Sequence, residues 1–498
     1  MTEPTRRPSL LRNIAGTWLG IGADAITGFL LTRIVLHAVG DASFGLWVLV
    51  SGLLGYYGLL DLGTRNAVIR FVARHNAQKD AESLSSVVST ALAAYCAIGI
   101  AVMLLAVVFA WRLQDIFAFQ SAKDLADGKL LVLILGAGAA IGFPLSAFGG
   151  VLEGMQQFVR IGVVQASSTI TRAFVVVLFL RLGFGIVAVG AITVLFNVAA
   201  GLVNASFVLR HMPQVRLALV SVRRETLLTL AGFGVVTFWV SIANRLRFES
   251  DSLVIGNLIG LQMVAVFAIG AKVVAYSTEL VSAMAGVFTP ILSHADALGD
   301  RALLTRMTFT GNYYASLLAF PITVVLLFFG KLMIALWVGP QYALSYSVLA
   351  IITIPMAAYV SQSGSTRMLY GRGLHKSLAK LLLFEGAANL VLSILLARRF
   401  GIIGVAWGTA IPLLATSLIA LPWLSCRALG TSMGSYWKAA QLPALAMVAP
   451  LAALFAVIAM LRPDPGVLEG LTELALGGCM YAAMTINKFR KPSVQLAH

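Results

Sequence analysis

The sequence predicts an all-α polytopic membrane protein built from two related lobes. Hydrophobic residues make up 59% of the 498 positions and charged residues 11%, with a mean hydropathy of +0.91. A soluble domain of this size covers its surface with far more charge. Apolar runs of about 20 residues, the length that a helix needs to cross a bilayer, recur from end to end. The pattern of the first half also returns in the second half.

The apolar runs predict about 14 transmembrane helices. They cover residues 14–38, 43–63, 86–110, 129–151, 161–180, 186–209, 232–257, 262–285, 306–330, 345–365, 381–397, 402–425, 439–461 and 466–487. The first run follows three arginines, as in a secretory signal peptide. It is longer than the apolar region of such a peptide and lacks a convincing small-residue cleavage site, so we expect an uncleaved first span.

The positions of the basic residues predict the topology. Of the 36 lysines and arginines, 23 lie at the ends and in the loops after even-numbered spans, eight lie on the opposite side, and five lie inside spans. Loops rich in Lys and Arg stay in the cytoplasm, so both termini are expected there. The same distribution explains the net charge of +16 without a nucleic-acid partner, and no basic aromatic platform or zinc spacing suggests one.

An internal repeat predicts the domain organisation. Residues 39–40 align with residues 259–260 at an offset of about 220 positions. Further along the chain the offset is slightly smaller, and residues 181–183 align with residues 399–401. Each repeat holds six spans, and an even number returns the chain to the same side, so the repeats are expected to be parallel. Three domains are predicted. They are an N-terminal lobe at residues 1–222, a C-terminal lobe at 223–430, and two additional transmembrane helices with a cytoplasmic tail at 431–498.

The seventh span carries an unusual group of charges, Arg245, Arg247, Glu249 and Asp251. A charge at the bilayer centre costs about 3 kcal/mol, so this stretch is either a loop or a helix that lines a polar path. The repeat favours one uninterrupted helix over 234–258, because a loop at 247–252 would break the parity of the spans. On such a helix Arg245 lies four residues before Glu249, and Arg247 four before Asp251, so each pair can interact.

Other spans add further charges. Lys272, Tyr276 and Glu279 share a face of the eighth span, Asp24 and Arg33 lie on the first, and Arg172 lies on the fifth. Such charges commonly face a bundle interior and mark a transport path, and their cationic excess suits a phosphate group. The predicted substrate-binding residues are Arg245, Arg247, Lys272, Arg172 and Arg33, and the predicted ion-coupling residues are Asp24, Glu249, Asp251 and Glu279. The alternative is that these charges form structural ion pairs or extend to the membrane interface, as expected for Asp61 and Glu385.

The sequence gives little support for an enzymatic function. The six histidines are scattered, no phosphate-binding loop is present, and the longest outward loop, about 112–128, is short for a glycan polymerase or ligase site. The three cysteines show neither pairing nor metal spacing. The sequence therefore predicts no catalytic residues, no metal site and no cofactor.

Several short motifs carry a family resemblance. They are Gly58-Leu59-Leu60-Asp61-Leu62-Gly63, Arg70-Phe71-Val72-Ala73-Arg74, Val151-Leu152-Glu153-Gly154, Met368-Leu369-Tyr370-Gly371, Leu336-Trp337-Val338-Gly339-Pro340-Gln341-Tyr342 and Arg399-Phe400-Gly401-Ile402-Ile403-Gly404-Val405-Ala406. The order and spacing of these motifs extend over nearly the whole chain. By them the sequence resembles the polysaccharide (Wzx-type) flippases of the multidrug/oligosaccharidyl-lipid/polysaccharide exporter (MOP) superfamily.

The resemblance implies a two-lobed transporter that works by alternating access in the bacterial inner membrane. Its cargo would be an undecaprenyl-pyrophosphate-linked oligosaccharide for lipopolysaccharide or exopolysaccharide. Transport would be driven by an ion gradient, and the partners would be a polysaccharide polymerase and chain-length machinery. Charges in spans one and seven are implied to act, here Asp24, Arg245 and Arg247. A lipid II flippase and a multidrug cation antiporter remain alternatives, although the cationic bias disfavours the second. An integral-membrane glycosyltransferase would need a larger outer loop, and an assembly partner would not explain mid-membrane charges.

Overall fold

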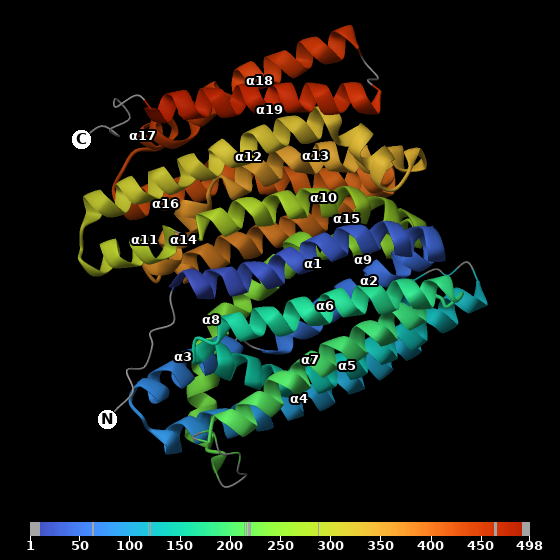
Figure 1. Ribbon diagram of the computed structural model, residues 1–498, viewed down its shortest axis with the longest axis vertical. Coiled ribbons are helices and arrows are strands. Elements are labelled where there is room, and N and C mark those ends of the chain that lie inside the picture. The colour runs from blue at the N-terminus through green and yellow to red at the C-terminus, as the bar shows by residue number, and fades with distance from the viewer. Residues whose placement is uncertain are drawn as a thin grey trace. The chain divides into compact units, whose positions relative to one another are not determined.

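The computed structural model describes residues 10–61, 64–117, 119, 121–213, 215, 217, 221–286, 288–462 and 466–490. Every regular element within these ranges is a helix (Figure 1), which confirms the predicted all-α class. Ten of the described helices are long and apolar enough to cross a membrane. Residues 1–9 and 491–498, which carry part of the charge that predicts cytoplasmic ends, lie outside the described ranges.

The ten candidate spans differ from the predicted 14 at four places. Predicted spans 381–397 and 402–425 fall in one apolar stretch, Lys376–Leu429, which counts once. The predicted spans at 43–63, 232–257 and 466–487 are not among the ten, and the first of them is represented by a shorter apolar helix, Asp41–Leu53. The count of 14 stays a prediction.

The chain separates into two compact units. Unit 1 comprises Met1–Arg245 and Gly260–Ala265, and unit 2 comprises Leu246–Ile259 and Val266–His498. The two-lobed fold class is therefore seen in the structure. The first boundary falls inside a helix, after Arg245, whereas the sequence places it at residues 222–223. The predicted division at 222 and 430 stays a prediction.

Unit 1 consists of long helices that pack side by side. α4 packs along α5, α5 along α7, and α1 along α6 (Figure 1). Buried apolar side chains such as Tyr95, Leu152 and Val208 form a core between them. The elements of this unit, ending with the helix that leads into unit 2, are α1 (Leu10–Val39), α2 (Asp41–Tyr57), η1 (Gly58–Asp61), α3 (Thr64–Ala77), α4 (Ala81–Ile116), α5 (Ala122–Gly154), α6 (Phe158–Arg181), α7 (Ile186–His211) and α8 (Arg224–Phe248).

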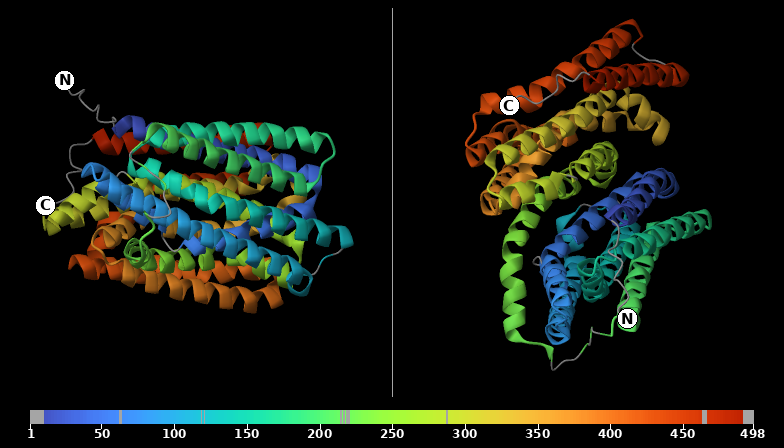
Figure 2. Two further views of the ribbon diagram at one scale, coloured as in Figure 1. Left: turned by 90° about the horizontal axis from the view of Figure 1, so that it is seen from below. Right: turned by 60° about the vertical axis from the view of Figure 1, so that its left-hand side comes forward.

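Unit 2 repeats this style of packing and adds helices at its C-terminal end. α12 packs against α13 and α18, and α15 packs against α13 and α9; the right-hand view of Figure 2 shows α18 and α19 next to each other. α10 (Leu261–Ala285) enters unit 2 after Ala265. The other elements are α9 (Ser250–Leu258), α11 (Phe288–Ala297), α12 (Arg301–Trp337), η3 (Pro340–Tyr342), α13 (Ala343–Val360), α14 (Ser363–Gly371), α15 (His375–Ala415), η4 (Thr416–Ala420), α16 (Leu421–Leu429), α17 (Met433–Tyr436), η5 (Trp437–Gln441), α18 (Leu442–Leu461) and α19 (Val467–Arg490).

The sequence repeat has a counterpart in local structure. Asp80 caps α4 by accepting a hydrogen bond from the backbone N–H of Ser83 at 3.0 Å, and Asp300 caps α12 through Leu303 at 2.9 Å. The residue before each cap has a positive φ, 56° at Lys79 and 69° at Gly299. A side-chain acceptor at this position satisfies an N–H that has no partner within the helix. Both long helices therefore begin in the same way at aligned positions.

The predicted uninterrupted helix over 234–258 is wrong in one respect. α8 ends at Phe248 and α9 begins at Ser250, with Glu249 between them at φ −119° and ψ −16°. The i,i+4 pairing rule assumes an unbroken helix. The break therefore removes the geometric basis for pairing Arg247 with Asp251 across it.

Candidate functional site

The break between α8 and α9 places an arginine in the interior of unit 2. Arg247 is 1% exposed, and its Nε donates a hydrogen bond to Oε1 of Glu385 on α15 at 2.5 Å. The rings of Phe248 and Tyr359 each lie 4.7 Å from the Arg247 guanidinium carbon. Glu385, expected at the membrane interface, is instead 2% exposed. A buried guanidinium needs such a partner because an unpaired charge in a low-dielectric interior is costly.

Asp251, one turn beyond Arg247, lies in a separate group of oxygen atoms. Thr409 Oγ1 donates to its Oδ2 at 2.7 Å, and Ser393 Oγ donates to its Oδ1 at 3.3 Å. Ser393 Oγ is also 3.2 Å from the side-chain oxygen of Asn389 and 3.4 Å from the carbonyl oxygen of Val405. All four side chains in this oxygen cluster (Asp251, Asn389, Ser393 and Thr409) are buried. Oxygen ligands of this kind suit a hard cation.

The chain reversal within α15 creates the oxygen cluster. Gly401 adopts φ 57° and ψ −140°, so the helix breaks there and the chain returns along itself. Asn389 and Ser393 precede the break, and Thr409 follows it. Gly408 allows the two halves to approach, because a Cβ at this position would lie 2.4 Å from Ser393 Oγ and 2.5 Å from its backbone nitrogen. Small residues commonly permit such close packing between membrane helices.

The oxygen cluster is joined to the arginine pair by one side chain. Asn389 Nδ2 donates to the carbonyl oxygen of Arg247 at 2.9 Å and lies 3.2 Å from Thr409 Oγ1. This carbonyl is at the end of α8, where the last carbonyls have no partner within the helix. Asn389 thus links the position of the break to the surroundings of Asp251.

Unit 1 brings two other predicted residues together. Asp24 on α1 accepts hydrogen bonds from Thr169 Oγ1 at 2.6 Å and from Gln165 Nε2 at 3.1 Å, both on α6. Arg172, one turn further on α6, places its Nη2 at 3.9 Å from Asp24 Oδ1. Its Nη1 reaches Oδ1 of Asn197 on α7 at 3.5 Å. A predicted coupling acid and a predicted substrate cation are therefore neighbours.

A cavity of about 540 Å³ opens beside this group, wholly within unit 1. Its polar wall includes Asp61 and Arg65, which sequence analysis did not select. Tyr95 donates its hydroxyl to Asp61 Oδ1 at 2.6 Å, and Arg65 Nη2 donates to Glu153 Oε1 at 2.6 Å. The lining consists of Trp47, Ser51, Asp61, Arg65, Leu135, Gly138, Ala139, Gly142, Phe143, Ser146, Thr193, Val194 and Asn197.

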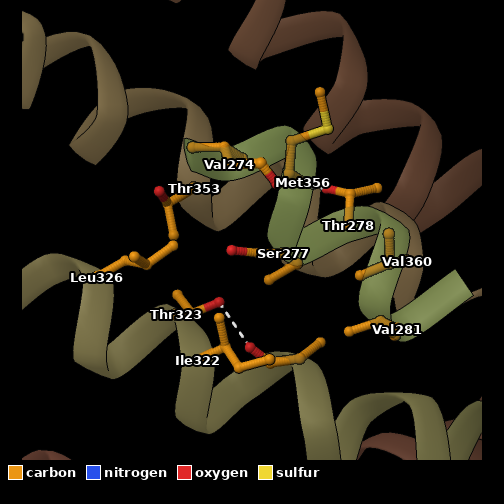
Figure 3. Close-up of a pocket in the computed structure, with 12 residues that line it drawn as sticks. Val274, Ser277, Thr278, Val281, Ile322, Thr323, Leu326, Thr353, Met356 and Val360 are labelled. Atoms are coloured by element: carbon orange, nitrogen blue, oxygen red, sulfur yellow. Dashed lines mark hydrogen bonds between the residues drawn. The ribbon is translucent and has the colours of Figure 1, made fainter. Parts of the chain in front are cut away.

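A second pocket, in unit 2, has a different character. It lies between α10, α12 and α13, and its volume of about 20 Å³ is near that of one water molecule (Figure 3). Its hydroxyl groups are used within their own helices: Ser277, Thr323 and Thr353 donate to carbonyl oxygens four residues earlier. Most of the other lining is aliphatic. The pocket can hold a water molecule but not a sugar.

The remaining predicted residues are distributed over both units. Arg245 is half-buried on α8 and belongs to unit 1, whereas Arg247 belongs to unit 2. Lys272 is half-buried on α10, and Glu279, on the same helix, is exposed. Arg33 is exposed on α1. The predicted pairing of Arg245 with Glu249 stays a prediction.

Sequence reasoning missed most of the oxygen cluster. Asn389 and Ser393 are polar residues four apart inside an otherwise apolar run. That spacing places them on one helix face and was the available signal. Thr409 carried no such signal, because a lone hydroxyl in an apolar helix usually donates to its own backbone. Glu385 was excluded because it lies near the end of its run.

Comparisons with known proteins agree with this architecture. A family model described as "Polysaccharide biosynthesis protein" matches residues 10–295. A Shigella flexneri protein, provisionally named an O-antigen transporter, is 21% identical over 427 residues, which cover 84% of this chain and 98% of the relative.

Solved structures share the fold. The lipid II flippase MurJ in an inward closed conformation matches with a TM-score of 0.75 and 16% identity, over 96% of this chain and 99% of that chain. An inward-facing multidrug resistance MATE transporter of the MOP superfamily matches with a TM-score of 0.69 and 17% identity, over 85% and 96%. At these identities the likeness concerns the fold.

The ten membrane-length helices among the described residues and these structural matches together define a multi-pass helical membrane protein that shares its fold with the MOP-superfamily structures. More particularly, the chain belongs to the polysaccharide biosynthesis protein family, whose model matches more than half of its length. The predicted family resemblance is thereby confirmed.

Proposed function

We propose that this protein is a flippase, not an enzyme, that moves a polyprenyl-pyrophosphate-linked oligosaccharide across the bacterial inner membrane for export of a surface polysaccharide. The observation that carries the proposal is a group of cations inside the apolar helices of a chain of this family: Arg33, Arg172, Arg245, Arg247 and Lys272 lie in the interior of its predicted spans. A diphosphate is the part of such a substrate that most needs compensating charge inside the membrane. The O-antigen assignment of the Shigella relative supports the same substrate class.

The intramembrane cations would have two different roles. Arg245, Lys272 and Arg172 are half-buried and Arg33 is exposed, so we propose that these four meet the diphosphate and acidic sugars. Arginine suits phosphate because its planar fork donates two parallel hydrogen bonds. Arg247 is already buried against Glu385, so in the proposal it positions the break between α8 and α9 and acts on the substrate only indirectly.

Ion coupling would centre on Asp251. Its carboxylate is buried and accepts hydrogen bonds from the hydroxyl groups of Thr409 and Ser393. Ser393 in turn lies close to the amide oxygen of Asn389 and the carbonyl oxygen of Val405, and oxygen ligands of these kinds fit a sodium ion. Ion binding there would act on Thr409 and Ser393, and through Asn389 on the carbonyl end of α8. Asp24, Glu249 and Glu279 remain proposed secondary coupling groups, and the expected partners are the polymerase and the chain-length machinery.

The substrate proposal is tested by replacing Arg245 and Lys272 together with glutamine. In a strain deleted for this gene, the wild-type copy should restore surface polysaccharide, and the double variant should fail although its membrane abundance is unchanged. Arg399→Gln, on an exposed residue of α15, is the matched control and should restore display. Normal display with the double variant would contradict the proposal, and altered drug susceptibility without any change in glycan would favour a multidrug antiporter.

A further inference from the structure

The cavity of unit 1 has a lining that neither lipid nor diphosphate explains. Its volume of about 540 Å³ falls in the usual range for small-molecule sites. α2 contributes Trp47 and Ser51, α5 contributes Phe143 and Ser146, and α7 contributes Asn197 with Thr193 and Val194. An apolar lipid chain would need neither hydroxyl nor amide groups, and a diphosphate would not need indole or phenyl rings.

The mixture of aromatic and polar groups matches the surface of a pyranose ring. Such a ring has apolar C–H faces that pack on the electron-rich face of an aromatic side chain, and an edge of hydroxyl groups that both donate and accept. Ser146 and Thr193 donate to the carbonyl oxygens of Phe143 and Val189, at 2.6 and 2.7 Å. Their oxygen lone pairs therefore remain able to accept hydrogen bonds from a ligand.

One polar atom in the lining is left for a ligand. Among the residues that the structure describes, none forms a hydrogen bond with the buried Oγ of Ser51. Buried hydroxyl groups are nearly always hydrogen-bonded, because desolvation without a partner is costly. Asp61, on the same wall, uses Oδ1 to accept from Tyr95, and a carboxylate has further acceptor capacity on its second oxygen.

The cavity also adjoins a proposed diphosphate-binding cation. Asn197 lines the cavity, and its Oδ1 accepts from Arg172 Nη1 at 3.5 Å. In a diphosphate-linked oligosaccharide the first sugar is bonded directly to the phosphate. A molecule with its diphosphate at Arg172 would therefore have its first sugars within reach of Asn197.

We propose that the cavity of unit 1 is a carbohydrate subsite that binds the sugars next to the diphosphate and so selects which lipid-linked glycan is transported. The proposal rests on the proposed function, because it takes the cargo to be a diphosphate-linked glycan. Trp47 and Phe143 provide the stacking surfaces, and Ser51, Asn197 and Asp61 bind the hydroxyl groups.

Gly142 offers a direct way to fill the cavity. It lies in the lining on α5, and a Cβ placed on it would meet no atom within 4 Å. Gly142→Leu should therefore occupy the site without overpacking the helices. Gly478 on α19 also has open space around it and lies outside the cavity, so Gly478→Leu is the matched control.

The test measures binding to the purified full-length protein in nanodiscs. The probes are undecaprenyl diphosphate alone and the same lipid carrying N-acetylglucosamine, glucose or galactose. The wild type should prefer at least one sugar-bearing lipid over the bare lipid by about tenfold, as expected for one or two hydrogen bonds and a stacking contact. Gly142→Leu should bring this ratio near one, and Gly478→Leu should leave it unchanged.

A second pair of variants tests the stacking surface directly, without the leucine introduced by Gly142→Leu. Trp47→Ala should lower the sugar preference, whereas Trp47→Phe should retain most of it. The inference is overturned if the wild type binds every sugar-bearing lipid no better than the bare lipid, or if Gly142→Leu keeps the full preference. A wild type that binds none of the lipids, the bare diphosphate included, would instead refute the proposed function.

Discussion

Single residues set the energetics of the interior of unit 2, above all Arg247 and Glu385. Each side chain is at most 2% exposed, and the two are 138 positions apart in the sequence. Removing one partner of a buried pair leaves an uncompensated charge, whereas replacing both with apolar residues removes the desolvation cost as well. The pair therefore holds the segment around Arg247 against α15 within unit 2 while adding little net stability.

Arg247→Met alone should destabilise the protein by about 3–5 kcal/mol, because Glu385 is left without its guanidinium partner. Arg247→Met combined with Glu385→Met should recover most of that loss. Denaturant unfolding of the detergent-solubilised protein measures both effects, with the exposed Arg399→Met as control. Additive losses in the double variant would show that the two side chains do not compensate each other.

Asp251 is the residue at which ion coupling is tested. Asp251→Asn keeps the shape of the side chain but removes the negative charge that a cation needs. In proteoliposomes, a sodium gradient should accelerate transport by the wild type and have no effect on the variant, while transport down a substrate gradient persists. Equal sodium dependence in the two proteins would place coupling elsewhere, and dependence on a proton gradient alone would identify the proton as the ion.

At the scale of elements, the two halves of α15 depend on glycines. Gly401 supplies the left-handed turn, and Gly408 brings the returning half against Ser393. Positive φ is accessible to glycine at little cost, and the absence of Cβ permits the approach. The oxygen cluster around Asp251 is therefore a product of this packing as much as of its own polar residues.

Gly408→Ala should destabilise unit 2 by about 1–3 kcal/mol, since its Cβ would overlap Ser393. The variant should also lose sodium-dependent transport, because Ser393 moves away from Asp251. Gly478→Ala, at an open helical position, should instead be neutral or stabilising, as replacing a helix glycine by alanine usually is. Thermal unfolding in detergent compares the two, and equal stability of the variants would contradict the packing argument.

At the scale of the whole molecule, the charge distribution makes a prediction about topology. Basic residues concentrate on one side of the predicted spans, so both termini should be cytoplasmic. Green fluorescent protein fused after His498 should fluoresce, and alkaline phosphatase at the same position should be inactive. Phosphatase inserted after Leu182, between α6 and α7, should be active. An active C-terminal phosphatase would place the C-terminus on the outer side of the membrane and contradict the prediction.

The amino-acid sequence by itself determined the class of the protein. Hydropathy, helix length and the scarcity of charge are properties of local composition, so they predict an all-α membrane protein without tertiary information. The sequence also predicted an internal repeat, because short matches recur in step with the spans, and the caps at the aligned positions Asp80 and Asp300 are alike. The motif order was enough to indicate the family.

Only the tertiary structure decided which groups meet. The sequence paired Arg247 with Asp251 because they are four residues apart, but the break at Glu249 and the approach of α15 give Arg247 a partner 138 positions away. The oxygen cluster needs the reversal at Gly401, and the cavity of unit 1 needs α2, α5 and α7 side by side. Periodicity reports neighbours along one helix, whereas these sites form between helices whose packing no local pattern encodes.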